Sequence, residues 1–249
     1  YGLIFAQGKI ENSFLNIDNK AALYSIFRTK KEMFNDKSYI GFLSTNFNFD
    51  DQNTNVYSID GLFDLNQYGL EFSYQYAKSI GQNKEGLAST YELDYYSKPL
   101  SFFHSITDLT KKNKKEFFIE SWLKYDNYDE NFDIDHLGYL FRNNLKSFDL
   151  GLVLYFFNDN IFDMSSLSLK SIYSKNYNNV VLEDIVSIDW NARLLNNWSI
   201  KLGISCNNES YLDKLYEDYF NETYLLNVNQ RNVKISPQKN YYFNINSDL

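Results

Sequence analysis

The chain has 249 residues, a formal net charge of −8 and an aromatic content of 18%, with 22 Tyr and 21 Phe. The negative charge argues against nucleic-acid binding, which depends on clustered Lys and Arg, and no run of about 18 to 20 apolar residues predicts a membrane-spanning helix. The single cysteine, Cys206, excludes an intrachain disulfide and a cysteine-based zinc site. The abundance of Tyr and Phe favours strands over helices.

Strand-like runs, each bounded by Asn, Asp, Lys, Ser or Gly, follow one another along the chain. This punctuation is typical of an antiparallel meander whose strands are joined by hairpins. Because no Gly/Ser tract marks a linker, we predict a single all-β domain over residues 1–249 with about fourteen strands. The strands are expected near residues 2–10, 19–28, 37–49, 55–65, 68–78, 87–96, 100–108, 115–125, 146–157, 164–174, 181–194, 198–206, 222–234 and 239–247.

The run from Tyr68 to Lys78 is the clearest predicted strand, because its apolar and polar residues alternate. Side chains alternate between the two faces of a strand, so this run has one apolar face and one face of small or polar residues. The apolar face holds Tyr68, Leu70, Phe72, Tyr74 and Tyr76, and the other face holds Gly69, Glu71, Ser73, Gln75 and Ala77. The same alternation recurs in 198–206 and 239–247.

Two architectures predict such alternation. In a soluble sandwich the apolar faces meet in a core, whereas in an outer-membrane-type β-barrel they meet lipid and the polar faces line a lumen. Strands of about ten residues suit a tilted bilayer crossing, and aromatic residues near strand ends suit interfacial girdles. Charged residues within the predicted strands suit a wet lumen as well as a solvated surface; they are Asp60, Glu71, Glu92, Glu120, Lys170 and Asp189.

Two segments interrupt the alternation. Residues 126–145 form an irregular, acidic stretch between two predicted strands, and residues 209–221 combine near-helical spacing of Tyr and Leu with acidic residues. We predict an elongated loop for the first segment, and a short helix or a long acidic loop for the second. The acidic stretch contains the weak candidates for a Ca²⁺ site, Asp126, Asp129, Asp133 and Asp135 together with Glu130. It lacks the glycine that an EF-hand loop requires, so we expect a solvated loop, no metal and no cofactor.

Catalytic constellations are not recognisable. The two histidines, His104 and His136, have no nucleophile elbow beside them, and the chain lacks a phosphate-binding glycine loop and an HExxH motif. We therefore expect no catalytic residues and no enzyme. Trp122, Trp190 and Trp198 could build a platform for sugars, although packing or anchoring at a membrane interface is the interpretation that we favour.

Several segments resemble one bacterial family. The stretch NFDIDHLGYL at 131–140, followed by Arg142, Asn143 and Asn144, is similar to a recurring segment of the DUF5916 family of predicted outer-membrane β-barrels, found in Bacteroidota-like bacteria. Further similarity lies in SYIGFLSTN at 38–46, VYSIDG at 56–61 and YQYAKS at 74–79, so the resemblance extends over residues 2–157. It implies a barrel in the outer membrane, often preceded by a domain like carbohydrate-binding family 9, and it supplies no catalytic residues.

The leading hypothesis is therefore an outer-membrane β-barrel, or a large fragment of one, in contact with lipid and with other envelope or surface proteins. Such a protein would act as a channel, transport component or surface scaffold. In this hypothesis the irregular loop folds into or over the lumen and restricts passage; its residues include Asp129, Phe132, Asp135, His136, Tyr139 and Arg142. The alternative is a soluble all-β binding module that recognises glycans through its aromatic side chains.

Overall fold

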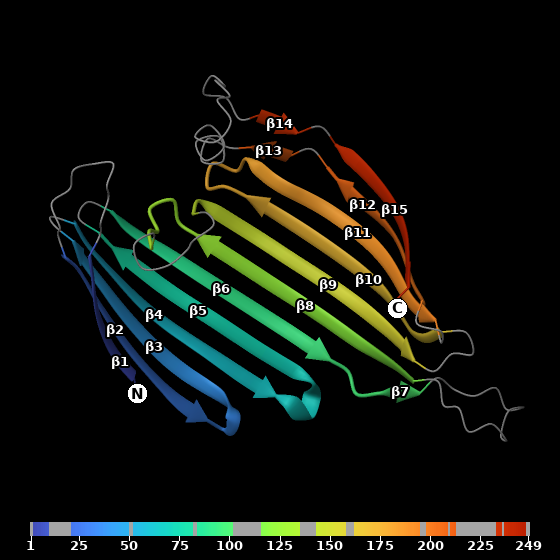
Figure 1. Cartoon of the computed structure of the whole chain (residues 1–249), viewed down its shortest axis with the longest axis horizontal. Coiled ribbons are helices and arrows are strands. Elements are labelled where there is room, and N and C mark those ends of the chain that lie inside the picture. Colours follow the sequence, from blue (N-terminus) through green and yellow to red (C-terminus); the bar gives the residue numbers. More distant parts are fainter. Residues whose placement is uncertain are drawn as a thin grey trace, which may run out of the picture. The chain divides into compact units, whose positions relative to one another are not determined.

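The computed structural model describes residues 2–9, 21–49, 52–81, 84–101, 116–134, 143–157, 162–194, 198–208, 210–212, 233–235 and 237–247. These residues form an antiparallel β-meander, as the alternation predicts (Figure 1). The main sheet contains thirteen strands, and apart from the two-residue β7 they are 8 to 15 residues long. The described residues contain no helix with the length and apolar character needed to cross a membrane.

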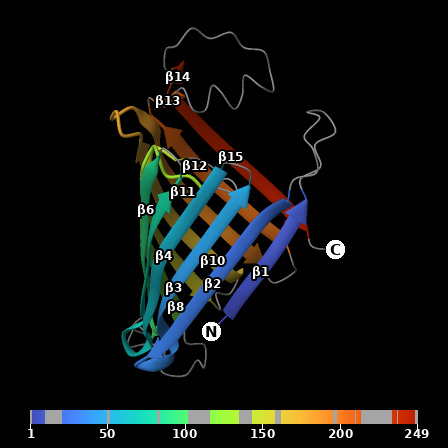
Figure 2. The ribbon, with the colours of Figure 1, turned by 90° about the vertical axis from the view of Figure 1, so that its left-hand side faces the viewer.

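The strands of the main sheet follow the order of the chain, and Figure 2 shows the first four side by side. They are β1 (Gly2–Lys9), β2 (Ala21–Met33), β3 (Asn35–Phe49), β4 (Gln52–Leu65), β5 (Leu70–Ile80), β6 (Glu85–Tyr96), β7 (Leu100–Ser101), β8 (Glu116–Tyr128), β9 (Leu145–Phe157), β10 (Phe162–Lys175), β11 (Val181–Leu194), β12 (Trp198–Asn207) and β15 (Gln238–Ser247). A separate two-stranded sheet pairs β13 (Ser210–Leu212) with β14 (Val233–Ile235).

Within the described residues the main sheet has thirteen strands and a second sheet adds two, so the strand count differs from the expected fourteen. Strand β13 falls within the segment for which we expected a helix or an acidic loop, and residues 213–221 of that segment lie outside the described part. The strand expected from residue 68 begins at Leu70, because Gly69 has a φ of +69° that follows the short 3-10 turn Asn66–Tyr68. The strand order ends at β1 and at β15, and no ladder joins these two strands within the described residues.

The chain divides into two compact units, and β4, β5, β6, β8 and β9 each contribute residues to both. The first unit comprises residues 1–64, 72–92 and 125–146, and the second comprises 65–71, 93–124 and 147–249. In the first unit, the register of β2, β3 and β4 places Arg28, Gly41, Ser58 and Asp60 on one side, which we call its polar face. The other side, its apolar face, includes Phe27, Tyr57 and Ile59 as exposed side chains.

The second unit has the same two kinds of face. Leu169, Ile188, Ile204 and Tyr241 lie opposite one another across β10, β11, β12 and β15, and these side chains are 41%, 47%, 45% and 71% exposed. This row marks the apolar face of the second unit. The neighbouring row on the opposite side consists of Lys170, Ser187, Ser205 and Asn240, and it marks the polar face. Apolar side chains are therefore exposed along this sheet.

Small polar side chains are buried as well as apolar ones. Among the described residues, the least exposed side chains are those of Phe47, Ser38, Ser79 and Ser174. Among the charged residues singled out in the sequence, Asp60 lies on the polar face of the first unit, and Lys170 and Asp189 lie on that of the second. This distribution differs from that of a soluble sandwich, in which the apolar faces are buried.

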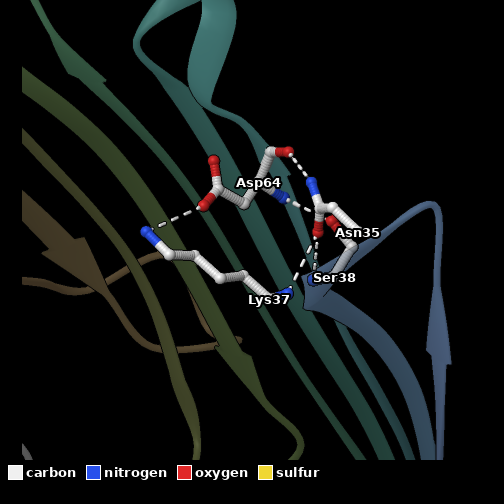
Figure 3. Close-up of polar contacts among 4 residues, drawn as sticks. All are labelled: Asn35, Lys37, Ser38 and Asp64. Carbon is white, nitrogen blue, oxygen red and sulfur yellow. Dashed lines mark hydrogen bonds and ion pairs between the residues drawn. The ribbon is translucent and has the colours of Figure 1, made fainter.

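Asn35 connects the β2–β3 hairpin to the end of β4 through hydrogen bonds (Figure 3). Its carboxamide oxygen accepts hydrogen bonds from the backbone N–H groups of Lys37 and Ser38 at 3.1 and 2.6 Å, and its nitrogen donates to the Asp64 carbonyl at 2.7 Å. The Ser38 hydroxyl accepts from the Asp64 N–H at 2.9 Å. These bonds hold a hairpin in which Phe34 has a φ of +62°, a conformation that a bulky side chain disfavours.

Candidate functional site: segment 129–134 on the polar face

The segment after β8 folds back onto the polar face of the first unit. Phe132 is only 4% exposed, and its ring packs against Val56, Ala77 and Ala88, which come from β4, β5 and β6. Tyr128 and Ile134 pack against the same cluster. The two aromatic rings of Tyr128 and Phe132 are 6.4 Å apart between centroids. Phe132 therefore attaches the segment to the polar face of the first unit.

Backbone hydrogen bonds fix the segment at three points. The N–H of Asp129 donates to the carbonyl of Leu87 on β6 at 2.9 Å, and the N–H of Asp133 donates to the hydroxyl of Ser79 on β5 at 3.0 Å. Between them, the N–H of Phe132 donates to the carbonyl of Asp129 at 3.2 Å and closes a turn. The segment is thus bonded to two neighbouring strands.

Asn143 holds the segment from its other side. Its side-chain nitrogen donates to the carbonyl of Glu130 at 2.9 Å and to the carbonyl of Phe132 at 3.3 Å. Asn144, which has a φ of +53°, donates its N–H to the carbonyl of Asp129 at 3.3 Å. The chain that returns to β9 therefore passes beside the segment that leaves β8.

Gly86 provides the space that the segment occupies. A Cβ atom added to Gly86 would lie 2.1 Å from the Phe132 nitrogen and 2.3 Å from the carbonyl carbon of Asn131. Both atoms are backbone, so neither can rotate away. The sequence pattern alone does not mark Gly86, Ser79, Ala77 or Ala88 as part of a site. The signal in the sequence is that small residues occupy alternate positions of β5 and β6, which leaves the polar face shallow there.

Of the predicted loop residues, Asp129 and Phe132 lie in this segment, whereas Asp135, His136, Tyr139 and Arg142 lie outside the described residues, as does His104. The candidate metal ligands have other partners. Asp126 accepts a hydrogen bond from the Thr90 hydroxyl at 2.9 Å, and Asp129 accepts one from the N–H of Asn131 at 2.8 Å. In the described part of the chain, no group of three or more His, Cys, Asp or Glu side chains is arranged to hold a metal ion.

An ion pair and a hydrogen bond connect strands elsewhere on this polar face. The guanidinium of Arg28 contacts both carboxylate oxygens of Asp60, and the Gln75 amide donates to the Ser58 hydroxyl at 3.2 Å. The face therefore combines a charged pair, amides and hydroxyls with one apolar anchor point at Phe132. Such a surface can hold a loop in place and still present polar groups to water.

Comparisons with family models, curated proteins and solved structures found no match. The resemblance to the DUF5916 family stays a prediction from the sequence.

Proposed function

We propose that the chain forms the wall of a bacterial outer-membrane β-barrel that has no catalytic activity and serves as a channel, transport component or surface scaffold. The main observation in favour is the row of exposed apolar side chains on each unit, opposite a face where polar side chains bond to one another. Lipid contact would remove the apolar rows from water, and an aqueous lumen would solvate the polar faces.

The dimensions of the strands support this proposal. A tilted strand needs about nine to eleven residues to cross the hydrocarbon core of a bilayer, and β8 to β12 contain 10 to 14 residues each. Soluble proteins rarely expose contiguous apolar patches larger than a few hundred Å². A soluble glycan-binding module would have to cover the row from Leu169 to Tyr241 by another layer. For a barrel to close, the edge strands β1 and β15 would each need a strand to pair with.

In this proposal, segment 129–134 narrows the passage. Phe132 attaches it to the face that would line the lumen. The resemblance of this stretch to a recurring DUF5916 segment supports the same function. Envelope or surface proteins would then be partners, along with outer-membrane lipid.

The three tryptophans allow a direct test of which face meets lipid. Trp198 lies on the apolar face, two residues before Ile200 and four before Leu202, and is 44% exposed. Trp122 donates its indole N–H to Asp149 at 2.9 Å, and its ring covers Gly151. We propose two single-tryptophan variants reconstituted in phosphatidylcholine brominated on its acyl chains: Trp122→Phe with Trp190→Phe, and Trp190→Phe with Trp198→Phe.

We expect the bromine atoms to quench the fluorescence of Trp198 strongly and that of Trp122 weakly, because quenching requires close approach to the acyl chains. Equal quenching of both residues would contradict the proposed orientation of the two faces. A chain that stays soluble without detergent and shows no quenching of Trp198 would overturn the membrane proposal itself.

A further inference from the structure

Trp122 lies face-on against the backbone of the neighbouring strand in the second unit. A Cβ atom built on Gly151 of β9 would be 2.0, 2.3 and 2.3 Å from the indole atoms Cζ2, Cε2 and Cη2. An edge-on ring would give one short distance and two much longer ones, so these nearly equal distances place the flat face of the ring over Gly151. The opposite ring face is therefore directed away from the sheet.

A charged pair fixes the edge of this ring. The indole N–H donates to Oδ1 of Asp149 at 2.9 Å, and Oδ2 of the same carboxylate pairs with the Lys170 ammonium at 3.1 Å. The three residues come from β8, β9 and β10. Because the hydrogen bond and the glycine together determine the ring plane, Trp122 is held in one orientation before any ligand arrives.

Further hydrogen-bonding groups lie beside the ring. Glu120 stands two residues before Trp122 on the same side of β8, and its carboxylate accepts a hydrogen bond from the Tyr155 hydroxyl at 2.9 Å. Asp149 and Lys170 compensate each other in charge, and so do Glu120 and Lys124, which stand two residues before and two residues after Trp122 on the same side of β8. These surroundings therefore suit a ligand without net charge. No other aromatic ring stacks on Trp122 among the residues that the structure describes.

A flat aromatic face with carboxylate, ammonium and hydroxyl groups at its edge matches a ligand ring that has an apolar face and a polar rim. A pyranose has this character, since its axial C–H groups form an apolar face and its hydroxyl groups lie around the ring. We propose that Trp122, Asp149, Lys170, Glu120 and Tyr155 form a subsite for one ring of a neutral oligosaccharide. The proposal deepens the proposed function, because the subsite would lie on the wall of the lumen and would select sugars for passage.

The test uses the full chain purified in detergent, as the variant with Trp190→Phe and Trp198→Phe that retains only Trp122. Maltohexaose and cellohexaose are titrated to about 10 mM. This concentration would nearly saturate a sugar site with a Kd of about 1 mM, so even weak binding would be detected. We expect a saturable change in Trp122 fluorescence with at least one of the two sugars. The matched control with only Trp198 should show no saturable change, because that tryptophan lies on the opposite face.

Calorimetry with the variants Trp122→Ala and Trp122→Phe gives the second readout. We expect Trp122→Ala to weaken the affinity about tenfold, as the loss of one stacking contact implies, and Trp122→Phe to retain most of it. No saturable change with either hexaose, or an unchanged affinity in Trp122→Ala, overturns the subsite. Neither result affects the quenching of Trp198 by brominated lipid, so failure of the subsite is distinguishable from failure of the membrane proposal.

Discussion

The ion pair between Arg28 on β2 and Asp60 on β4 passes over the intervening strand β3. Gly41 of β3 pairs in register with Asp60, and a Cβ atom on Gly41 would lie 2.7 Å from Nη2 of Arg28 and 2.9 Å from Oδ1 of Asp60. Because Gly41 has no side chain, Arg28 and Asp60 can form a bidentate contact across β3. In this contact Nη2 of Arg28 lies 2.6 Å from Oδ2 of Asp60.

A double-mutant cycle with Arg28→Gln and Asp60→Asn should measure the strength of this pair. Arg28 is 36% exposed and Asp60 is 15% exposed, so solvent screens the attraction and we expect a coupling free energy of about 1 kcal/mol. Arg28→Gln alone should cost more than the double variant, because it leaves the less exposed carboxylate without its cation. Denaturant unfolding of the four proteins in detergent provides the free energies. Strict additivity of the two single substitutions would contradict the coupling.

Gly86→Ala should displace segment 129–134. The added Cβ atom would lie 2.1 Å from the Phe132 nitrogen, which is far inside contact distance, so the backbone of the segment has to move away from β6. We expect faster hydrogen exchange at the amides of Phe132 and Asp133 and new proteolytic cleavage within the segment.

Gly81→Ala is the matched control for this experiment. A Cβ atom at Gly81 has its nearest contact with the Lys84 carbonyl oxygen at 3.8 Å, an ordinary van der Waals distance. The exchange rates of the segment should therefore stay unchanged in Gly81→Ala. Equal acceleration in both variants would mean that any alanine in this hairpin loosens the segment, and that the close approach at Gly86 has no special effect.

Phe132→Ala should release segment 129–134 from the sheet without changing the sheet itself. Removing a buried phenyl ring costs about 3 kcal/mol of stabilising free energy. Here the contacts that are lost are those of the segment with Val56, Ala77 and Ala88. If the segment narrows a lumen, single-channel conductance in planar bilayers should rise. Phe148→Ala removes the same side chain from an exposed position, and it should leave the conductance unchanged. An unchanged conductance in Phe132→Ala, with exchange showing that the segment is released, would argue against restriction by this loop.

Asn35→Ala should weaken the β2–β3 hairpin. The substitution removes two acceptor contacts, to the amides of Lys37 and Ser38, and one donor contact to the carbonyl of Asp64. It also removes support from the positive φ of Phe34. We expect a loss of about 1 to 3 kcal/mol in unfolding free energy. Lys37→Met removes only the ion pair of an exposed lysine with Asp64, so its effect should stay below about 1 kcal/mol.

Alternation along the sequence predicts most of the strands, because a side-chain period of two is specific to extended backbone. The expected range 181–194 coincides with β11, and the expected range 146–157 differs from β9 by one residue. Both strands are long, and the sequence on either side of each is rich in Asn. The three-residue strands β13 and β14 are too short to show a period, so the sequence pattern does not reveal their pairing.

The docking of the loop could be predicted only in part. Phe132 is an apolar residue within the acidic stretch of the predicted loop, and in the structure its side chain is buried. Its partners Val56, Ala77 and Ala88 are far away in the chain. Small residues at alternate positions have no individual signature, and their role emerges only when the register brings three strands together.

A charge placed on the apolar face provides the sharpest distinction between lipid and water around this sheet. Ile204 and Ser205 are neighbours on β12 that point to opposite faces, and Ile204 is 45% exposed. In water, Ile204→Arg at such an exposed position should change the stability by less than about 0.5 kcal/mol. In a bilayer, an arginine on the lipid face costs about 2 to 4 kcal/mol near the midplane, whereas Ser205→Arg would enter the polar side at little cost. We therefore expect Ile204→Arg, and not Ser205→Arg, to lower the urea midpoint of the chain folded into lipid vesicles. Equal midpoints for the two arginine variants would show that Ile204 does not face hydrocarbon.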